Sequence, residues 1–492
     1  MIRIILIRHG HTAWNLAEGQ GRRFRGIIDL PLADEGVTQA QATAQRLADW
    51  PLTAIYSSPL QRAARTAQII AEPHDLSAQP LPGLGSMNYG EWAGRFYVDV
   101  ARRWPELYQQ WRCDPFSIQI PGGESTVALR DRAVTTLRTI LTRHDEGDTI
   151  ALVSHQVVTK TLACVLGGLP NTAYWQVRQD LCNLSRFDYD PTTDEFTVVG
   201  LNDTCHLSPA LPHAAGGVGS RPSAPGNGLW PQESGRNLPG RLAATCQPQE
   251  TGFAPKQEAA TELGGTRIVL VRHGQTAWNA GAGDPTLSGE RFRGHTDLPL
   301  DNVGQAQARA VANRLKNEPI SALYASPLLR TQQTAAPLAD ALCLPAQRHE
   351  GLIDINYGRF QGLTHSEAAA AYPVQAALWR TRPSQVHFPD GENLPDVQIR
   401  LLALLEEMAV RHPDSAEGKT IVLIGHQIVN KVLACTLLGL DLDQIWRIRQ
   451  DTCSFDLFQH VGTHAHWRGT LTLCLNDTCH LSGLSSHASG EL

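Results

Sequence analysis

Short, continuous apolar runs recur along the chain, and each is followed directly by a motif of charged or polar residues. The runs are Ile2–Ile7, Ala54–Tyr56, Ile150–Val153, Ile268–Val271, Ala322–Tyr324 and Ile421–Ile424. Runs of this kind are typical of strands that are buried on both faces of a parallel sheet. Apolar residues between them recur at helical spacing, as do Ala40, Ala44 and Leu47. This alternation predicts α/β domains with a central sheet.

The same motifs occur twice and in the same order, which indicates a duplicated domain. The matched segments are Arg8–Asn15 with Arg272–Asn279, Arg23–Leu32 with Arg291–Leu300, Ser58–Arg62 with Ser326–Arg330, and Leu201–Ser208 with Leu475–Ser482. A unit of about 200 residues is a whole domain, whereas array repeats have periods of about 20–50 residues. We therefore predict one domain over 1–207 and a second over 266–484.

The segment between the two copies, residues 208–265, has a different composition. Pro and Gly make up roughly 30% of it, a level typical of low-complexity or disordered segments. It has no periodic apolar pattern, so we predict a flexible linker. The alternative is a loop that packs on one domain through Leu229 and Trp230.

Composition excludes some classes of protein and leaves the chemistry open. A net charge of −6 without long basic runs argues against nucleic-acid binding. No apolar stretch reaches the roughly 20 residues that a membrane span requires, and the N-terminal run fits a strand better than a signal peptide. The ten cysteines include no Cys-x-x-Cys pair. We interpret them as reduced core thiols of a cytoplasmic protein, with Cys164, Cys182 and Cys205 repeated as Cys435, Cys453 and Cys479.

Arg and His side chains follow three predicted strands in each copy, where ligands bind in α/β sheets. In the second copy, Arg272 and His273 follow one strand, Arg330 another and His426 a third. Ser326 is the expected N-cap of a helix whose first turn carries Arg330. Guanidinium groups and a helix N-terminus suit a phosphate dianion. A neutral imidazole can attack phosphorus and form a phosphohistidine, and the leaving alkoxide then requires a nearby carboxylic acid as proton donor.

On these motifs the sequence resembles the histidine phosphatase superfamily, also called phosphoglycerate mutase-like. The resemblance rests on RHG-x-T-x-W-N, on SPL-x-R followed by Thr-Ala, on the later His, and on the segments Pro121–Ser125 and Pro389–Asn393. It implies a three-layer α/β/α domain, duplicated in tandem, with His9 and His273 as phosphoryl acceptors. The phosphate-binding residues it implies are Arg8, Asn15, Arg62 and His155, and Arg272, Asn279, Arg330 and His426.

The family's general acid lies in a segment that differs between the two copies. The second copy carries Asp354 at the acid position, and the first copy carries Ser86. Serine cannot replace a carboxylic acid as proton donor near neutral pH, and loss of a general acid typically costs about 10²–10⁴ in rate. The resemblance therefore implies one complete site, in the second copy, unless Glu91 or Glu124 substitutes in the first.

These observations lead to a phosphatase of a small phosphomonoester, with no cofactor, no metal and no nucleic-acid or membrane partner. Two alternatives stay open: a cofactor-dependent phosphoglycerate mutase, and a first domain that only binds a phosphorylated ligand. The arginines of the two RFRG segments are candidates for recognising a second anionic group of the substrate: Arg23, Arg25, Arg291 and Arg293. The duplication is compatible with pairing of the two domains within one chain or with a homo-oligomer.

Overall fold

The computed structural model describes residues 1–15, 22–208, 266–280, 290–412, 420–460 and 470–484. The predicted linker over 208–265 lies almost entirely outside the described residues, so its character stays a prediction. The first half runs β1 (Ile2–Arg8), α1 (Asp34–Leu47), β2 (Ala54–Ser57), α2 (Gln61–Ala71), β3 (Gln79–Pro80), α3 (Tyr97–Arg103), α4 (Pro105–Cys113), α5 (Thr126–Leu141), β4 (Thr149–Ser154), α6 (Gln156–Leu166), β5 (Leu184–Asp190) and β6 (Glu195–Asp203). The second half runs β7 (Arg267–Arg272), α7 (Ala277–Ala280), α8 (Asn302–Leu315), β8 (Ile320–Ala325), α9 (Leu329–Leu342), β9 (Ala346–Arg348), α10 (His365–Ala371), α11 (Pro373–Thr381), α12 (Leu394–Arg411), β10 (Thr420–Gly425), α13 (Gln427–Leu438), β11 (Phe455–Gln459) and β12 (Leu471–Asp477).

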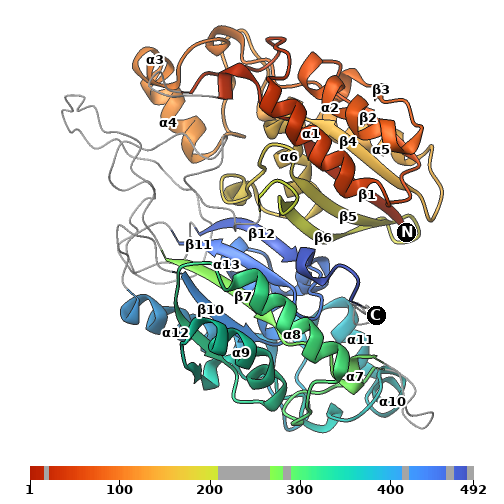
Figure 1. Ribbon diagram of the computed structural model, residues 1–492, viewed down its shortest axis with the longest axis vertical. Helices are drawn as coiled ribbons and strands as arrows, with labels where there is room; N and C mark the ends of the chain where they lie inside the picture. The colour runs from red at the N-terminus through yellow and green to blue at the C-terminus, as the bar shows by residue number, and fades with distance from the viewer. Residues whose placement is uncertain (16–21, 209–265, 281–289, 413–419, 461–469, 485–492) are drawn as a thin grey trace.

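All twelve strands of the described residues belong to one sheet, which confirms the duplicated α/β fold and joins the two halves (Figure 1). The strand order is β3-β2-β4-β1-β5-β6-β12-β11-β7-β10-β8-β9, so the second half repeats the first in reverse. The apolar runs form the parallel strands β2, β4 and β1, and β8, β10 and β7. Each half then adds two antiparallel strands, which the apolar runs do not include, and β6 pairs antiparallel with β12 at Leu201 and Leu475.

The strands are buried on both faces, as continuous apolar runs predict. In β1, Ile5 and Ile7 pack with residues of α1 and α2, whereas Ile4 and Leu6 belong to the core on the side of α5 and α6. The second half has the same arrangement, with α8 and α9 on one face and α12 and α13 on the other. The core on the side of α5, α6, α12 and α13 is a single cluster that runs through both halves. The two halves therefore share a hydrophobic core as well as a sheet.

A disulfide joins equivalent cysteines of the two halves, which corrects one expectation. Cys205 and Cys479 follow β6 and β12 and are bonded to each other, with their Cα atoms 6.4 Å apart. The interpretation of all the repeated cysteines as reduced thiols is wrong for this pair. The cause is topological, because pairing of β6 with β12 brings the two equivalent loops together. The other repeated cysteines are unpaired and buried, as expected: Cys164, Cys182, Cys435 and Cys453.

The helix that carries Arg330 begins later than the sequence predicts. Helix α9 begins at Leu329 with Leu328 as its N-cap, and no side chain caps it. Ser326 is therefore not the N-cap: its Oγ accepts from Leu328 N at 3.4 Å, before the helix begins, and lies 2.8 Å from His426 Nε2. Arg330 still lies in the first turn, so its predicted placement at the helix start holds.

No helix among the described residues combines the length and apolar character needed to cross a bilayer.

Candidate active site

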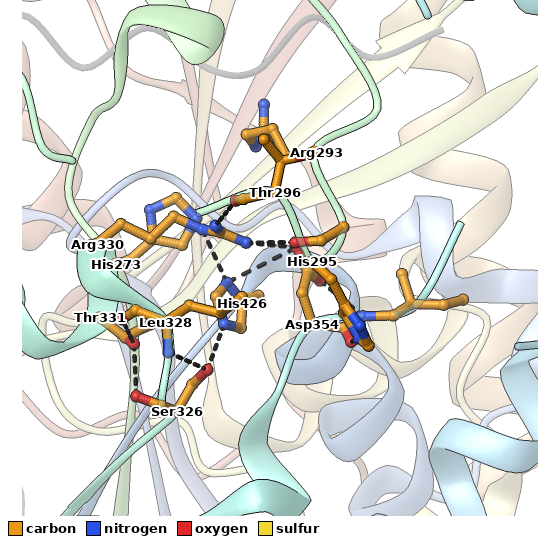
Figure 2. Close-up of polar contacts among 12 residues, drawn as sticks. His273, Arg293, His295, Thr296, Ser326, Leu328, Arg330, Thr331, Asp354 and His426 are labelled. Atoms are coloured by element: carbon orange, nitrogen blue, oxygen red, sulfur yellow. Dashed lines mark hydrogen bonds and ion pairs between the residues drawn. The ribbon is translucent and has the colours of Figure 1, made fainter. Parts of the chain in front are cut away.

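The site of the second half forms where three parallel strands end side by side. His273 follows β7, Arg330 follows β8 in the first turn of α9, and His426 follows β10 as the N-cap of α13. Because β8, β10 and β7 are neighbours in the sheet, their carboxyl ends meet at one edge. The rings of His273 and His426 lie with their centroids 5.2 Å apart. The structure thus brings together residues that are more than 150 positions apart in the sequence (Figure 2).

The guanidinium of Arg330 organises this site through contacts on three sides. Its Nη1 and Nη2 donate to the carbonyls of Thr296 and Gly294, both at 2.8 Å. Its Nη2 also contacts Asp354 Oδ2 at 3.1 Å, and its Nε donates to His426 Nδ1 at 3.2 Å. Since His426 Nδ1 accepts, the proton of this ring lies on Nε2, which donates to Ser326 Oγ at 2.8 Å. One arginine therefore fixes both the tautomer of His426 and the position of Asp354.

The two histidines that follow the first strand of each half have one nitrogen committed to the backbone. His273 Nδ1 lies 2.7 Å from the carbonyl of Gly274, and His9 Nδ1 lies 2.7 Å from that of Gly10. A carbonyl only accepts, so Nδ1 carries the proton and Nε2 carries the lone pair. This geometry presents Nε2 of each ring as a nucleophile.

Burial and neighbouring cations keep these imidazoles neutral. Burial, and then the charges of Arg330 and Arg272, hold the pKa of His273 well below its ordinary value. Burial, and then His155 and Arg62, do the same to the pKa of His9. A neutral imidazole is the nucleophilic form, so both rings are in the reactive protonation state near pH 7.

Asp354 is held at the site by its backbone as well as by its carboxylate. Its carbonyl accepts from His295 Nε2 at 2.9 Å and from Arg400 Nη2 at 3.3 Å. Its Oδ1 accepts from the backbone N–H of Ile355 at 3.0 Å, and its Oδ2 lies 3.7 Å from His426 Nδ1. The carboxylate predicted as general acid therefore lies against the predicted phosphate-binding residues.

The first half reproduces this scaffold without the carboxylate. Arg62 donates to the carbonyls of Ile28 and Gly26, both at 2.8 Å, and His155 Nε2 lies 2.8 Å from Ser58 Oγ. The rings of His9 and His155 again have centroids 5.2 Å apart. Ser86 occupies the position of Asp354. Among the described residues, Arg62 Nε and His155 Nδ1 are buried with no hydrogen-bond partner, so the bond that joins Arg330 to His426 has no counterpart here.

Neither glutamate considered as a substitute acid is placed for that role. Glu124 is paired with Arg132 at 2.6 Å and accepts from the backbone of Asn88. Glu392 makes the matching contacts in the second half, with Arg400 and the backbone of Asn356. Because the half that has Asp354 keeps this pair too, Glu124 serves the scaffold that both halves share. Glu91 is exposed.

The predicted asparagines and RFRG arginines differ in the groups that they contact. Asn15 and Asn279 accept through Oδ1 from the preceding threonines, Thr12 and Thr276. Arg25 donates to Asn15 Oδ1 at 2.7 Å, whereas Arg293 forms an ion pair with Glu290 at 3.0 Å. The guanidinium of Arg23 lies over the ring of Phe96, 3.9 Å from its centroid. Arg291 donates to the carbonyl of Gly362 at 2.5 Å and pairs with Glu367 at 3.3 Å.

Sequence reasoning missed three residues of the second site, namely Glu290, Ser326 and His365. A pocket there is lined by Arg291 and by Glu290, Arg293, Asp354, His365, Trp379 and Trp446. Glu290 directly precedes the second RFRG segment, at the position where the first copy has Arg22. This difference beside a repeated segment is the sequence signal that the two sites differ here. Ser326 is visible as a repeated residue, but its local sequence predicts a helix cap and not a contact with His426. His365, in the position of Tyr97, had no signal in its local sequence.

One group of described residues has metal-ligand chemistry, and it lies at and just after the end of β6. Asp203, Cys205 and His206 place their ligand atoms within 4.8 Å of one another. The sulfur of Cys205 is bonded to Cys479, so it does not offer a thiolate to a metal in this structure.

Comparison with known proteins places the chain in a family. The model of the histidine phosphatase superfamily (branch 1) matches residues 4–204 and again residues 268–470. The chain therefore belongs to the histidine phosphatase superfamily, and its enzymatic class is that of phosphatases acting on phosphate esters.

Individual relatives match one half of the chain at a time. The phosphoserine phosphatase 1 of Hydrogenobacter thermophilus is 32% identical over 215 residues, which is 44% of this chain and 94% of the relative. The probable phosphoglycerate mutase GpmB of Yersinia pestis is 35% identical over 219 residues, 43% of this chain and 98% of the relative. The α-ribazole phosphatase structure from Shigella flexneri is 29% identical with a TM-score of 0.37, covering 41% of this chain and 96% of that one.

Proposed function

We propose that the second half hydrolyses a small phosphomonoester through a phosphohistidine on His273, and that the first half does not turn over efficiently. One observation carries this proposal: the Asp354 carboxylate lies 3.1 Å from Arg330 and 3.7 Å from His426, and the first half has Ser86 there. The nucleophile and the phosphate-binding groups are present in both halves. Among the described residues, the position beside these groups carries a carboxyl group in the second half, Asp354, and a hydroxyl in the first, Ser86.

The proposed reaction has two steps at phosphorus. First, His273 Nε2 attacks, the P–N bond forms and the ester P–O bond breaks, while Asp354 gives its proton to the departing alkoxide. Then a water attacks phosphorus, Asp354 takes a proton from it, and the P–N bond breaks to release inorganic phosphate. Arg272, Arg330 and His426 stabilise the charge on the phosphoryl oxygens in both steps. The products are the alcohol and phosphate, and Asp354 regains in the second step the proton that it gives in the first.

Two single substitutions test the asymmetry. His273→Ala should abolish phosphate release from a panel of phosphomonoesters, whereas His9→Ala should leave it nearly unchanged. Equal losses from the two changes would show that both halves turn over. Because the Yersinia relative carries the name of a mutase, the same assay should also follow return of the phosphoryl group to a phosphoglycerate. Transfer without net phosphate release would favour the mutase.

A further inference from the structure

Among the described residues, the first site carries more positive charge than the second, and the difference comes from two positions. Ser86 replaces Asp354, and Arg22 replaces Glu290. The acids Asp180 and Asp29 lie near Arg8 and Arg62 in the first site. They have counterparts in Asp451 and Asp297 near Arg272 and Arg330, so they do not offset the difference.

The extra charge is concentrated beside the position expected to hold the phosphate. Arg25, Arg22 and Tyr97 occupy the places of Arg293, Glu290 and His365 in the second half. Arg22, Arg25 and Arg8 each act to lower the pKa of the Tyr97 phenol against the larger effect of burial, which raises it. Three guanidinium groups therefore lie near the Tyr97 hydroxyl, and two of them, those of Arg8 and Arg25, also act on His9.

The charge of Arg25 is not neutralised as that of Arg293 is. Arg293 is paired with the carboxylate of Glu290 at 3.0 Å. Arg25 instead donates to two neutral oxygens, Thr12 Oγ1 at 2.9 Å and Asn15 Oδ1 at 2.7 Å, and it has no carboxylate partner among the described residues.

Buried polar atoms in the same site also lack partners. Arg62 and His155 are 1% and 3% exposed, and Arg62 Nε and His155 Nδ1 have no hydrogen-bond partner within the described part of the chain. Burial and the charge of Arg25 lower the pKa of Arg8 to about 9 and that of Arg62 to about 10. A buried cluster of cations is stabilised by an anion that supplies both charge and acceptors.

We propose that the first half is a binding site for a small phosphomonoester with a second anionic group, either a carboxylate or another phosphate. The phosphate binds at Arg8, His9, Arg62 and His155, and Arg22, Arg25 and Tyr97 hold the second anion. The absence of turnover at this site rests on the function proposed above. The preference for a second anion rests only on the charges around Arg25.

Binding to the full-length His273→Ala chain tests the inference, because the second half then does not consume the ligand. The probes are 2-phosphoglycolate for a carboxylate, fructose 1,6-bisphosphate for a second phosphate, and methyl phosphate for a single anion. Adding Arg22→Glu, which copies Glu290, should weaken binding of 2-phosphoglycolate, of fructose 1,6-bisphosphate or of both roughly 10–100-fold. It should weaken binding of methyl phosphate by a clearly smaller factor, since that ligand reaches only the phosphate-binding residues and lies farther from the changed charge. The probe that responds identifies the second anion.

Arg143→Glu is the matched control, because it makes the same charge change at an exposed position of the same half. It should leave all three affinities unchanged, and Arg22→Gln should give an intermediate loss if Arg22→Glu disturbs folding. Equal weakening of all three probes by Arg22→Glu, or no weakening of either larger probe, would overturn the inference. Phosphate release by the His273→Ala chain that disappears on adding His9→Ala would instead overturn the proposed function, and the charge preference would still be measurable.

Discussion

The two halves keep one scaffold and differ in the side chains that it presents. Gly90 and Gly358 show how closely the backbones correspond, because both have positive φ and both pass a proline carbonyl within about 2 Å of where a Cβ would lie. Glycine is needed at both positions. Against this background, three substitutions stand out: Ser86 for Asp354, Arg22 for Glu290, and Ser185 for Asp456. A duplicated fold can thus retain its geometry while one copy changes its chemistry.

Asp354→Ser would make the second site resemble the first and should have the largest effect. The leaving alkoxide loses its proton donor, so kcat/KM for an alkyl phosphate should fall by about 10²–10⁴. An aryl phosphate has a better leaving group and depends less on the acid, so it should lose much less. Steady-state rates with one substrate of each kind measure the difference.

Ser86→Asp is the reciprocal change, made in the His273→Ala background where the second half is inactive. It should raise alkyl phosphate hydrolysis at the first site above that of the background chain. An Asp354→Ser enzyme that loses equal activity toward both substrates would argue against Asp354 as proton donor.

The sequence predicted the site better than it predicted the relation between the halves. His273, Arg330 and His426 could be placed because each follows a buried strand, and parallel strands end at one edge. The union of the halves in one sheet could not, since β6 and β12 contact each other across 274 residues and no local pattern records that pairing.

The missed residues show the same limit at a finer scale. A local rule predicts Ser326 as a helix cap, but the helix begins later and the Ser326 hydroxyl contacts His426. The disulfide also results from tertiary pairing, that of β6 with β12. The spacing of the cysteines does not predict it, because that spacing fits buried thiols as well. Local patterns therefore singled out residues that the structure brings together, and the contacts between distant segments had to come from the structure.

Cys205→Ser tests whether the disulfide stabilises the pairing of the halves. Removing a crosslink between distant residues raises the conformational entropy of the unfolded chain. The free energy of unfolding should therefore fall by roughly 2–5 kcal/mol. Thermal unfolding measures the shift, and titration should find one additional free thiol, that of Cys479. A reductant should lower the stability of the unmodified chain to a similar extent and leave the variant unaffected. Cys343→Ser, at an exposed unpaired cysteine, should change stability by less than about 0.5 kcal/mol.

Asp456→Ser copies Ser185 and should change how stability depends on pH. Burial raises the pKa of Asp456 in the folded chain to about 7, from 3.8. The folded state therefore holds a proton that the unfolded state releases between these values. The stability from this proton is present below about pH 4 and is lost as the pH rises through about 7. Relative to the variant, the unmodified chain should lose up to about 1.4 kcal/mol for each pH unit in this window.

Urea unfolding of both chains at pH 5 and pH 8 measures this loss as a difference. The comparison with the variant is needed because buried neutral histidines such as His273 give stability the opposite slope, falling as the pH drops below about 6.5. A stability difference between the two chains that is the same at both pH values would contradict a raised pKa at Asp456.

The smallest expected effect concerns the N-terminal caps of two equivalent helices, α12 and α5. Helix α12 begins with a reciprocal capping box, in which Asn393 Oδ1 accepts from Asp396 N at 2.8 Å and Asp396 Oδ2 accepts from Asn393 N at 3.1 Å. Helix α5 has only one of these bonds, from Ala128 N to Ser125 Oγ at 3.1 Å. Asn393→Ala should cost about 1 kcal/mol or slightly more, and Ser125→Ala about 1 kcal/mol or less. Asp396→Ala leaves the second half with the single bond of the first and should cost less than Asn393→Ala. If thermal unfolding shows that Asp396→Ala destabilises the chain more than Asn393→Ala does, the bond to the N-cap side chain is not the dominant bond of the box.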